Sequence, residues 1–181
     1  QVDMPFLCPW DGNNIMQVLQ QNEKIKQYFV NLLKEYNLQL TMDIAAQELR
    51  VLKPLEDSSS FIMPYMALAD SIKRLMFYKA AIDSNRDSVL MFEELEAHAY
   101  PPYISIIAQT IIQNPRNQYF LTTHSPYVVN EFLEDKTLDV AIHIVDYRNG
   151  KTIVKTLNEE EMAEVYEYGI DLFFNTEAFL D

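Results

Sequence analysis

Acidic residues and a histidine stand at the ends of two short apolar stretches of the sequence. Glu93 and Glu94 directly follow apolar residues 88–92, and His124 follows a second such stretch at 119–122. A helical pattern separates the two stretches, and a strand, helix, strand unit requires parallel pairing of its strands. Because ligands bind outside the carboxyl ends of parallel strands, these side chains should converge at one sheet edge. Adjacent strand residues point to opposite faces, so one glutamate can hold a metal ion through water while the other polarises an attacking water.

The elements that must position these side chains predict an α/β fold, a parallel sheet flanked by helices. Residues 88–92 are continuously apolar, as in a strand buried on both faces, and a helix is predicted from Pro101 to Ile112. The sequence after His124 predicts a short helix at 128–133 and a strand at 140–146. A hairpin turn at Asn149-Gly150 then leads into a strand at 152–157. The last predicted helix is capped by Asn158 and Glu161, runs to Tyr168 and is ended by Gly169.

The first part of the chain predicts a mainly helical lobe over residues 1–85, with the α/β half-core over 86–181. Residues 1–13 are expected to be irregular and to end in a turn. The remaining expectations are a helix capped by Asn22 and reaching Tyr36, a strand at 38–44 that pairs with 49–52, a polar break at 54–61, and a long helix from Tyr65 to about Asp83.

Composition excludes several classes of protein. With 14 basic and 27 acidic side chains the net charge is −13, which disfavours direct binding of nucleic acid. The hydrophobic fraction of 49% suffices for a folded core. A single cysteine, Cys8, excludes an intrachain disulfide, and no apolar run approaches the roughly 20 residues of a membrane span. We therefore expect a soluble protein of the reducing cytoplasm.

Glycine gives the sharpest exclusion. The 3 glycines are Gly12, Gly150 and Gly169, so the chain contains neither a G-x-x-x-x-G-K-[ST] phosphate loop nor a G-x-G-x-x-G loop. The chain cannot hold a triphosphate in a glycine-rich loop of its own. It also begins with Gln1 instead of Met, which predicts a processed chain or a piece of a longer one.

The same residues admit less specific interpretations. Acidic residues between a strand and a helix often only favour the helix dipole, and a lone histidine is often a turn residue. A zinc site formed by Glu94, Glu96 and His98 fits poorly, because metalloprotease helices present H-E-x-x-H. Cys8 is expected to be a small buried thiol.

Two motifs resemble a known family. Residues 88–101 (SVLMFEELEAHAYP) resemble the Walker B segment and following loop of the ATP-binding-cassette-like AAA ATPases, which include the RecF, structural-maintenance-of-chromosomes (SMC) and overcoming-lysogenization-defect groups. Residues 119–126 (YFLTTHSP) resemble the histidine switch of these ATPases, and 68–74 occupy the position of the signature helix. The resemblance implies a P-loop NTPase-like fold, and the chain corresponds to the C-terminal half that lacks the phosphate loop.

The resemblance also implies roles for individual residues. Glu93 corresponds to the acid associated with magnesium, Glu94 to the residue that polarises the hydrolytic water, and His124 to the γ-phosphate sensor. Glu96 and His98 would lie in the loop that crosses a dimer interface. The implied cofactors are ATP and Mg²⁺, both needing the missing half, and the implied partners are a second copy and a nuclease or other effector domain.

The chain departs from the family pattern at two places. Leu95 replaces the proline after the two acids, and Ala69-Asp70 replaces the Ser-Gly of the signature, so Ser71 is the remaining small polar residue there. An aspartate at that position repels phosphate. The first hypothesis is therefore one half of an ATP-hydrolysing ATPase that is inactive by itself, and the rival is a nonhydrolytic protein-interaction module derived from such an ATPase.

Overall fold

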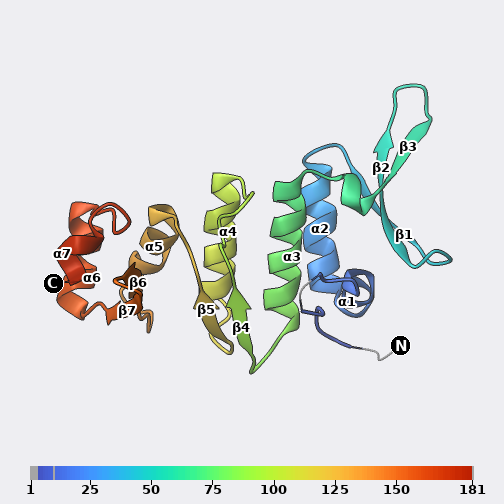
Figure 1. The fold of residues 1–181 in the computed structure, drawn as a ribbon. Helices are drawn as coiled ribbons and strands as arrows, with labels where there is room; N and C mark the ends of the chain where they lie inside the picture. Colours follow the sequence, from blue (N-terminus) through green and yellow to red (C-terminus); the bar gives the residue numbers. More distant parts are fainter. Residues whose placement is uncertain (1–3, 10, 181) are drawn as a thin grey trace. The chain divides into compact units, whose positions relative to one another are not determined.

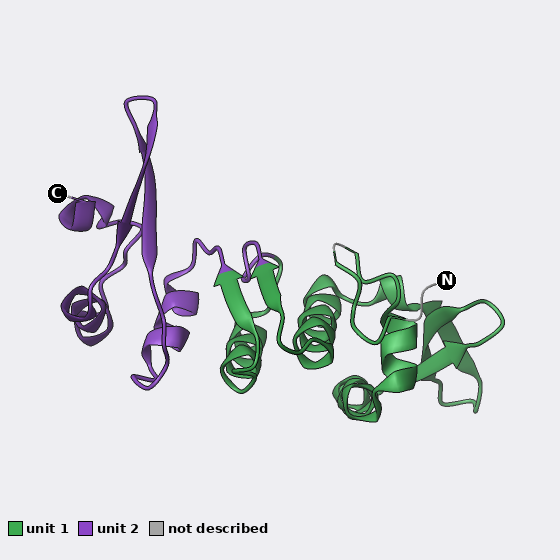
Figure 2. Ribbon diagram, turned by 90° about the horizontal axis from the view of Figure 1, so that it is seen from below, with its two compact units in different colours: residues 1–91, 98–120 green, residues 92–97, 121–181 purple. Residues whose placement is uncertain are grey.

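The computed structural model describes residues 4–9 and 11–180 of the chain. The chain divides into two compact units, shown in different colours in Figure 2. Unit 1 comprises Gln1–Met91 and His98–Phe120, and unit 2 comprises Phe92–Ala97 and Leu121–Asp181. The functional division between residues 85 and 86 stays a prediction.

The helices of unit 1 build its core. They are α1 (Ile15–Gln21), α2 (Glu23–Lys34), α3 (Asp70–Ser84), α4 (Pro101–Ile112) and the 3-10 helix η1 (Tyr65–Ala67). The side chain of Asn22 accepts a hydrogen bond from the Ile25 N–H at the start of α2, so the predicted cap is confirmed. Helix α3 contacts α1, α2 and α4 (Figure 1). Its Leu75 and Met76 are fully buried.

Unit 1 also contains an antiparallel sheet of three strands. Its strands are β1 (Gln39–Asp43), β2 (Glu48–Pro54) and β3 (Ser60–Pro64), in the order β1-β2-β3. The predicted pairing of the first two strands is confirmed, with Leu40 opposite Val51. Strand β3 begins inside the polar break predicted at 54–61 and was not predicted. The long helix predicted from Tyr65 begins only at Asp70, because Tyr65–Ala67 form the separate turn η1, so its predicted start was wrong.

Strands β4 (Val89–Phe92) and β5 (Gln118–Leu121) form the predicted pair around α4. The Gln118 N–H donates to the Ser88 carbonyl at 2.9 Å, and the Thr122 N–H donates to the Phe92 carbonyl at 3.0 Å. The same offset at both ends means that the strands run in parallel, and the α/β class is confirmed. One face of this pair is exposed and apolar, with Val89 55%, Met91 75% and Phe120 52% accessible.

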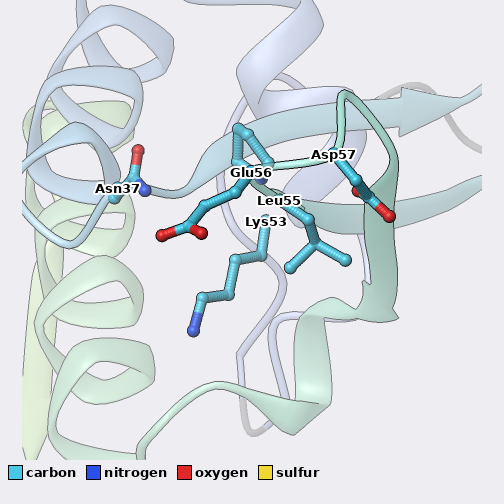
Figure 3. Close-up of a pocket in the computed structure, with 6 residues that line it drawn as sticks. Asn37, Lys53, Leu55, Glu56 and Asp57 are labelled. Carbon is cyan, nitrogen blue, oxygen red and sulfur yellow. The ribbon is translucent and has the colours of Figure 1, made fainter.

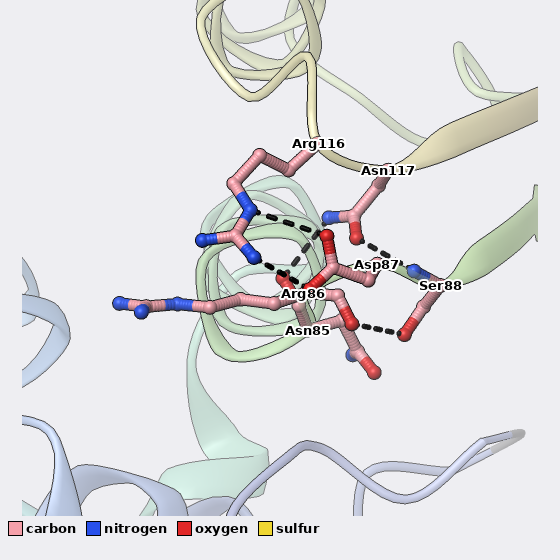
Figure 4. Close-up of polar contacts among 6 residues, drawn as sticks. All are labelled: Asn85, Arg86, Asp87, Ser88, Arg116 and Asn117. Carbon is pink, nitrogen blue, oxygen red and sulfur yellow. Dashed lines mark hydrogen bonds and ion pairs between the residues drawn. The ribbon is translucent and has the colours of Figure 1, made fainter.

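A polar cluster connects the loops that precede β4 and β5 (Figure 4). The Asn117 side chain accepts from the Ser88 N–H at 3.1 Å and donates to the Asn85 carbonyl at 3.0 Å. The Arg116 guanidinium donates to both carboxylate oxygens of Asp87, at 3.2 and 2.5 Å. These bonds fix the register of the two strands where they begin.

Unit 2 contains helices α5 (Pro126–Leu133), α6 (Glu159–Tyr168) and α7 (Thr176–Leu180) and the hairpin of β6 (His143–Arg148) and β7 (Lys151–Thr156). Its buried core comprises Ile144, Leu157, Val165, Leu172 and Phe179. The predicted turn is confirmed, because Asn149 and Gly150 have φ values of 51° and 78°, as a tight hairpin requires.

The ends of α6 also match the sequence. Asn158 and Glu161 exchange side-chain and backbone hydrogen bonds in a capping box, and Gly169 ends the helix with φ 61°. The strand predicted from Val140 instead begins at His143, and it pairs with β7. None of the helices among the described residues is long and apolar enough to span a membrane.

Candidate functional site

The ends of β4 and β5 are joined by Thr122, the residue that follows β5. Its hydroxyl accepts a hydrogen bond from the Glu94 N–H at 3.1 Å, and its carbonyl accepts a long one from the Leu95 N–H at 3.4 Å. The backbone on either side of the Glu94 side chain is therefore held against the end of the neighbouring strand. All of these residues belong to unit 2.

Glu94 adopts a backbone conformation that glutamate rarely occupies. Its φ is 45°, in the left-handed region, where a residue other than glycine is strained by roughly 1–3 kcal/mol. The following residue, Leu95, is fully buried and anchors the turn. A proline at this position, as in the family pattern, would have no N–H to donate to Thr122. The departure at Leu95 therefore adds a contact between the two loops.

Glu96 connects the loop after β4 to the loop after β5. One carboxylate oxygen accepts from the Thr123 hydroxyl at 2.7 Å, and the other accepts from the His124 N–H at 2.6 Å. The Thr123 hydroxyl oxygen in turn accepts from the Ser125 N–H at 3.0 Å. Hydrogen bonds to an ionised acceptor are the strong ones in proteins. Glu96 thus fixes the backbone of the segment that carries His124.

Glu94 and His124 come close to each other. The His124 Nε2 lies 3.8 Å from the Glu94 Oε1, with the two side chains 78% and 52% exposed. This separation is longer than a hydrogen bond. Glu93 is also exposed, directly after β4. The convergence expected for parallel strands is thus present, whereas the roles of these side chains stay predictions.

The residues at the signature position lie in unit 1. Ala69 precedes α3 and makes no capping hydrogen bond with its side chain, while Asp70 and Ser71 begin the helix. The Asp70 carboxylate lies 2.8 Å from the Lys73 ammonium. The pKa of Asp70 is lowered mainly by its hydrogen bond and charge interaction with Lys73, and further by the charges of His98 and Arg74.

The donor set at the end of β4 is compatible with Mg²⁺. This ion is commonly held through one or two carboxylates together with water and substrate phosphates, which a single exposed glutamate such as Glu93 can serve. The described residues contain no group of three or more histidine, cysteine, aspartate or glutamate side chains that could hold a metal alone. A metal at this edge would therefore need phosphate or water ligands as well.

An open pocket of about 520 Å³ lies in unit 1, among residues other than those at the ends of β4 and β5 (Figure 3). It is lined by Asn37 and by residues 53–57, which include Lys53 and Glu56. It contains none of the residues that the sequence singled out.

Two residues of the site were missed by the sequence analysis. Thr122 and Thr123 lie within the switch-like segment, but nothing assigned their hydroxyls to Glu94 and Glu96. The available signal was the occurrence of two consecutive hydroxyl residues directly after a strand, where side chains often bind a neighbouring backbone.

Neither a protein-family model nor a curated protein matches the sequence. Solved structures of SMC heads do match the fold. One, described as concerning ATP-driven dimerization and DNA-stimulated activation of SMC ATPases, has a TM-score of 0.54 and 17% identity, and the match covers 86% of this chain and 96% of that chain. An SMC head bound to the C-winged helix domain of ScpA has a TM-score of 0.55 and 17% identity, over 84% of this chain and 50% of that chain.

A third structure is the SMC head with an extended coiled coil from Pyrococcus furiosus, bound to the C-terminal domain of ScpA. It has a TM-score of 0.54 and 17% identity, over 87% of this chain and 40% of that chain. The chain thus spans half or less of the last two structures. The likeness to SMC heads that the motifs indicated is confirmed at the level of the fold.

Proposed function

We propose that this chain forms the C-terminal half of an SMC-like ATPase head and supplies the residues that activate water for ATP hydrolysis. The observation that carries the proposal is the 3.8 Å approach of His124 to Glu94 beyond the ends of two parallel strands. The side chains are exposed, and the backbone N–H of each donates a hydrogen bond to a side-chain oxygen of the neighbouring loop. The likeness to SMC ATPase heads supports this class of chemistry.

Glu94, His124 and Glu93 have different roles in this proposal. The Glu94 carboxylate accepts a hydrogen bond from the attacking water and polarises it, and the His124 imidazole donates to the terminal phosphate as charge develops there. Glu93 is the carboxylate that would hold Mg²⁺. Bound Mg²⁺ supplies Lewis-acid stabilisation of the phosphate oxygens. Residues Thr122 and Glu96 contribute by keeping the two loops in place.

The phosphate-binding part of the site comes from polypeptide outside these 181 residues. A glycine-rich loop must supply the phosphate-binding amides, because this chain has none. We further propose that two copies of the complete ATPase close around two nucleotides, with residues 69–71, Glu96 and His98 on the nucleotide side of the interface. We also propose that the complete ATPase lies in the cytoplasm and is coupled to a nuclease or another effector domain.

The test is ATP turnover by the complete ATPase carrying Glu94→Gln. The amide cannot act as a base toward water, so turnover should fall by at least about 100-fold while ATP stays bound. Glu160→Gln in the first turn of α6 removes the same charge outside the site and should leave turnover unchanged. Turnover retained in Glu94→Gln, or lost equally in Glu160→Gln, would contradict the role of Glu94.

A nonhydrolytic interaction module is the second candidate. It is favoured by Asp70, whose carboxylate occupies the first turn of α3, where a partner's phosphate would have to approach. If this candidate is right, the complete protein has no ATP turnover that depends on Glu94, and Glu94→Gln leaves its assembly with partners unchanged.

A further inference from the structure

The imidazole of His124 has an aromatic neighbour from a distant part of the chain. The ring centroids of His124 and Phe173 lie 6.2 Å apart, with an angle of 54° between the ring planes. This separation lies within the range of about 4.5–7 Å in which aromatic rings attract each other through tilted or edge contacts. Both residues belong to unit 2. Neither the motif that contains His124 nor any pattern around Phe173 indicates this contact.

The turn that carries Phe173 is fixed by its own hydrogen bonds. The Asp171 carboxylate accepts from the N–H groups of Phe173 at 2.9 Å and Phe174 at 3.4 Å. The Asn175 side chain donates to the Asp171 carbonyl at 2.8 Å. Leu172, inside the turn, is 6% exposed and belongs to the core of unit 2. The backbone that carries Phe173 is therefore held by these hydrogen bonds and by the buried Leu172.

The two phenylalanines of the turn differ in their surroundings. Phe174 is 90% exposed, whereas Phe173 is 38% exposed and contacts the imidazole. The backbone N–H of His124 is held by Glu96 at 2.6 Å, and the Glu94 carboxylate lies 3.8 Å from its Nε2. A histidine side chain that is 78% exposed would otherwise sample several rotamers. Glu96 fixes only its backbone.

We propose that Phe173 is a positioning residue for His124, restricting the imidazole to orientations in which its Nε2 faces Glu94. The catalytic consequence rests on the proposed function. The aromatic ring is the active feature, because an aliphatic side chain has no ring edge or face to orient an imidazole. Phe174 provides a matched control, since its replacement deletes an equal ring from the same turn.

The experiment is NMR of the histidine rings in the full 181-residue chain. The chain has 3 histidines, so the carbon-bound ring protons of His124 are assigned by comparison with His124→Gln. We expect nuclear Overhauser contacts between the His124 and Phe173 rings. The His124 ring signals should shift in Phe173→Leu, stay nearly unchanged in Phe174→Leu, and return toward their original positions in Phe173→Tyr.

Absence of the ring-to-ring contacts in the unsubstituted chain would overturn the proposal, and that measurement requires no variant to fold. Equal shifts of His124 in Phe173→Leu and Phe174→Leu would also overturn it. In the complete ATPase, Phe173→Leu should lower kcat by about 10- to 100-fold with little change in the KM for ATP, and Phe173→Tyr should restore it. If the unsubstituted ATPase lacks turnover, the proposed function fails, while the NMR result still decides the positioning of His124.

Discussion

At the scale of single residues, Glu96 adds a second connection between the two loops beside the one made by Thr122. Its carboxylate receives one hydrogen bond from a side chain and one from the backbone of the segment that carries His124. Both bonds lie within one chain. Glu96 can therefore support the site before any dimer forms, whatever contact it makes across an interface.

Replacing Glu96 by alanine should loosen the backbone at His124. A hydrogen bond to a charged group contributes about 1.5–3 kcal/mol, so the exchange of the His124 amide with solvent should accelerate by roughly 10- to 100-fold. Hydrogen exchange followed by NMR measures this directly. Glu93→Ala, which removes a neighbouring exposed carboxylate, should leave the exchange rate of this amide unchanged. An unchanged rate in Glu96→Ala would mean that the bond to the His124 N–H does not protect it in solution.

The residues of the site were predictable only where backbone geometry decides their position. Parallel strands end at one edge, so the approach of Glu94 to His124 followed from the two strands and the helix between them. The contact of Phe173 with His124 depends on how the chain after α6 turns and packs. The spacing of residues along the sequence does not predict such a contact, because the contact results from tertiary packing alone.

At the scale of helices and strands, predictability followed the presence of local signals. The caps of α2 and α6 and the turn at Asn149-Gly150 are set by neighbouring residues, and they were predicted correctly. Strand β3 was missed because Phe61 and Ile62 are both exposed, so its sequence lacks the alternation of a half-buried strand. Helix α1 was not predicted, because it is only 7 residues long and its N-cap makes no side-chain hydrogen bond.

The capping box of α6 predicts a dependence of stability on pH. The pKa of Glu161 lies below its ordinary value of 4.5, mainly because its carboxylate accepts from the Lys155 ammonium and further because it accepts from the Asn158 N–H. Folding therefore favours the ionised form. This contribution to stability is fully present above the pKa of the unfolded chain and is lost as the pH falls through the lower pKa of the folded chain.

Glu161→Gln should consequently lower the thermal unfolding temperature at neutral pH, and its difference from the unsubstituted chain should shrink as the pH falls below about 4.5. Circular dichroism melting curves over this range measure the effect. Glu160→Gln, on the same helical turn but outside the capping box, should show no such pH-dependent difference. A constant difference at all pH values would assign the effect of Glu161 to something other than its ionisation.

At the scale of the whole molecule, the acidic composition and the scarcity of glycine act in the same direction. A net charge of −13 opposes the approach of a triphosphate, and the chain has no glycine-rich loop whose amides could offset that repulsion. These are properties of the entire sequence and were fully readable from it. The division into two compact units was not, because it depends on which segments pack together.

The isolated chain should therefore bind MgATP weakly. Isothermal titration calorimetry with ATP up to the millimolar range should show no stoichiometric binding. In a matching titration with ATP and no Mg²⁺, the Glu93→Gln and Glu94→Gln double variant, which removes two negative charges from the strand ends, should bind ATP no more weakly than the original chain. Stoichiometric binding at micromolar ATP would mean that the chain holds the nucleotide without a glycine-rich loop.

The exposed apolar face of β4 and β5 has a consequence for handling the protein. Val89, Met91 and Phe120 lie on a pair of strands with unpaired outer edges among the described residues, and such edges act as templates for aggregation. At low ionic strength the charge of −13 keeps copies apart, but salt above about 0.1 M shortens the range of this repulsion to about 10 Å. The chain should consequently be stored in dilute, low-salt buffer, and concentrating it in high salt should produce reversible turbidity before any loss of secondary structure.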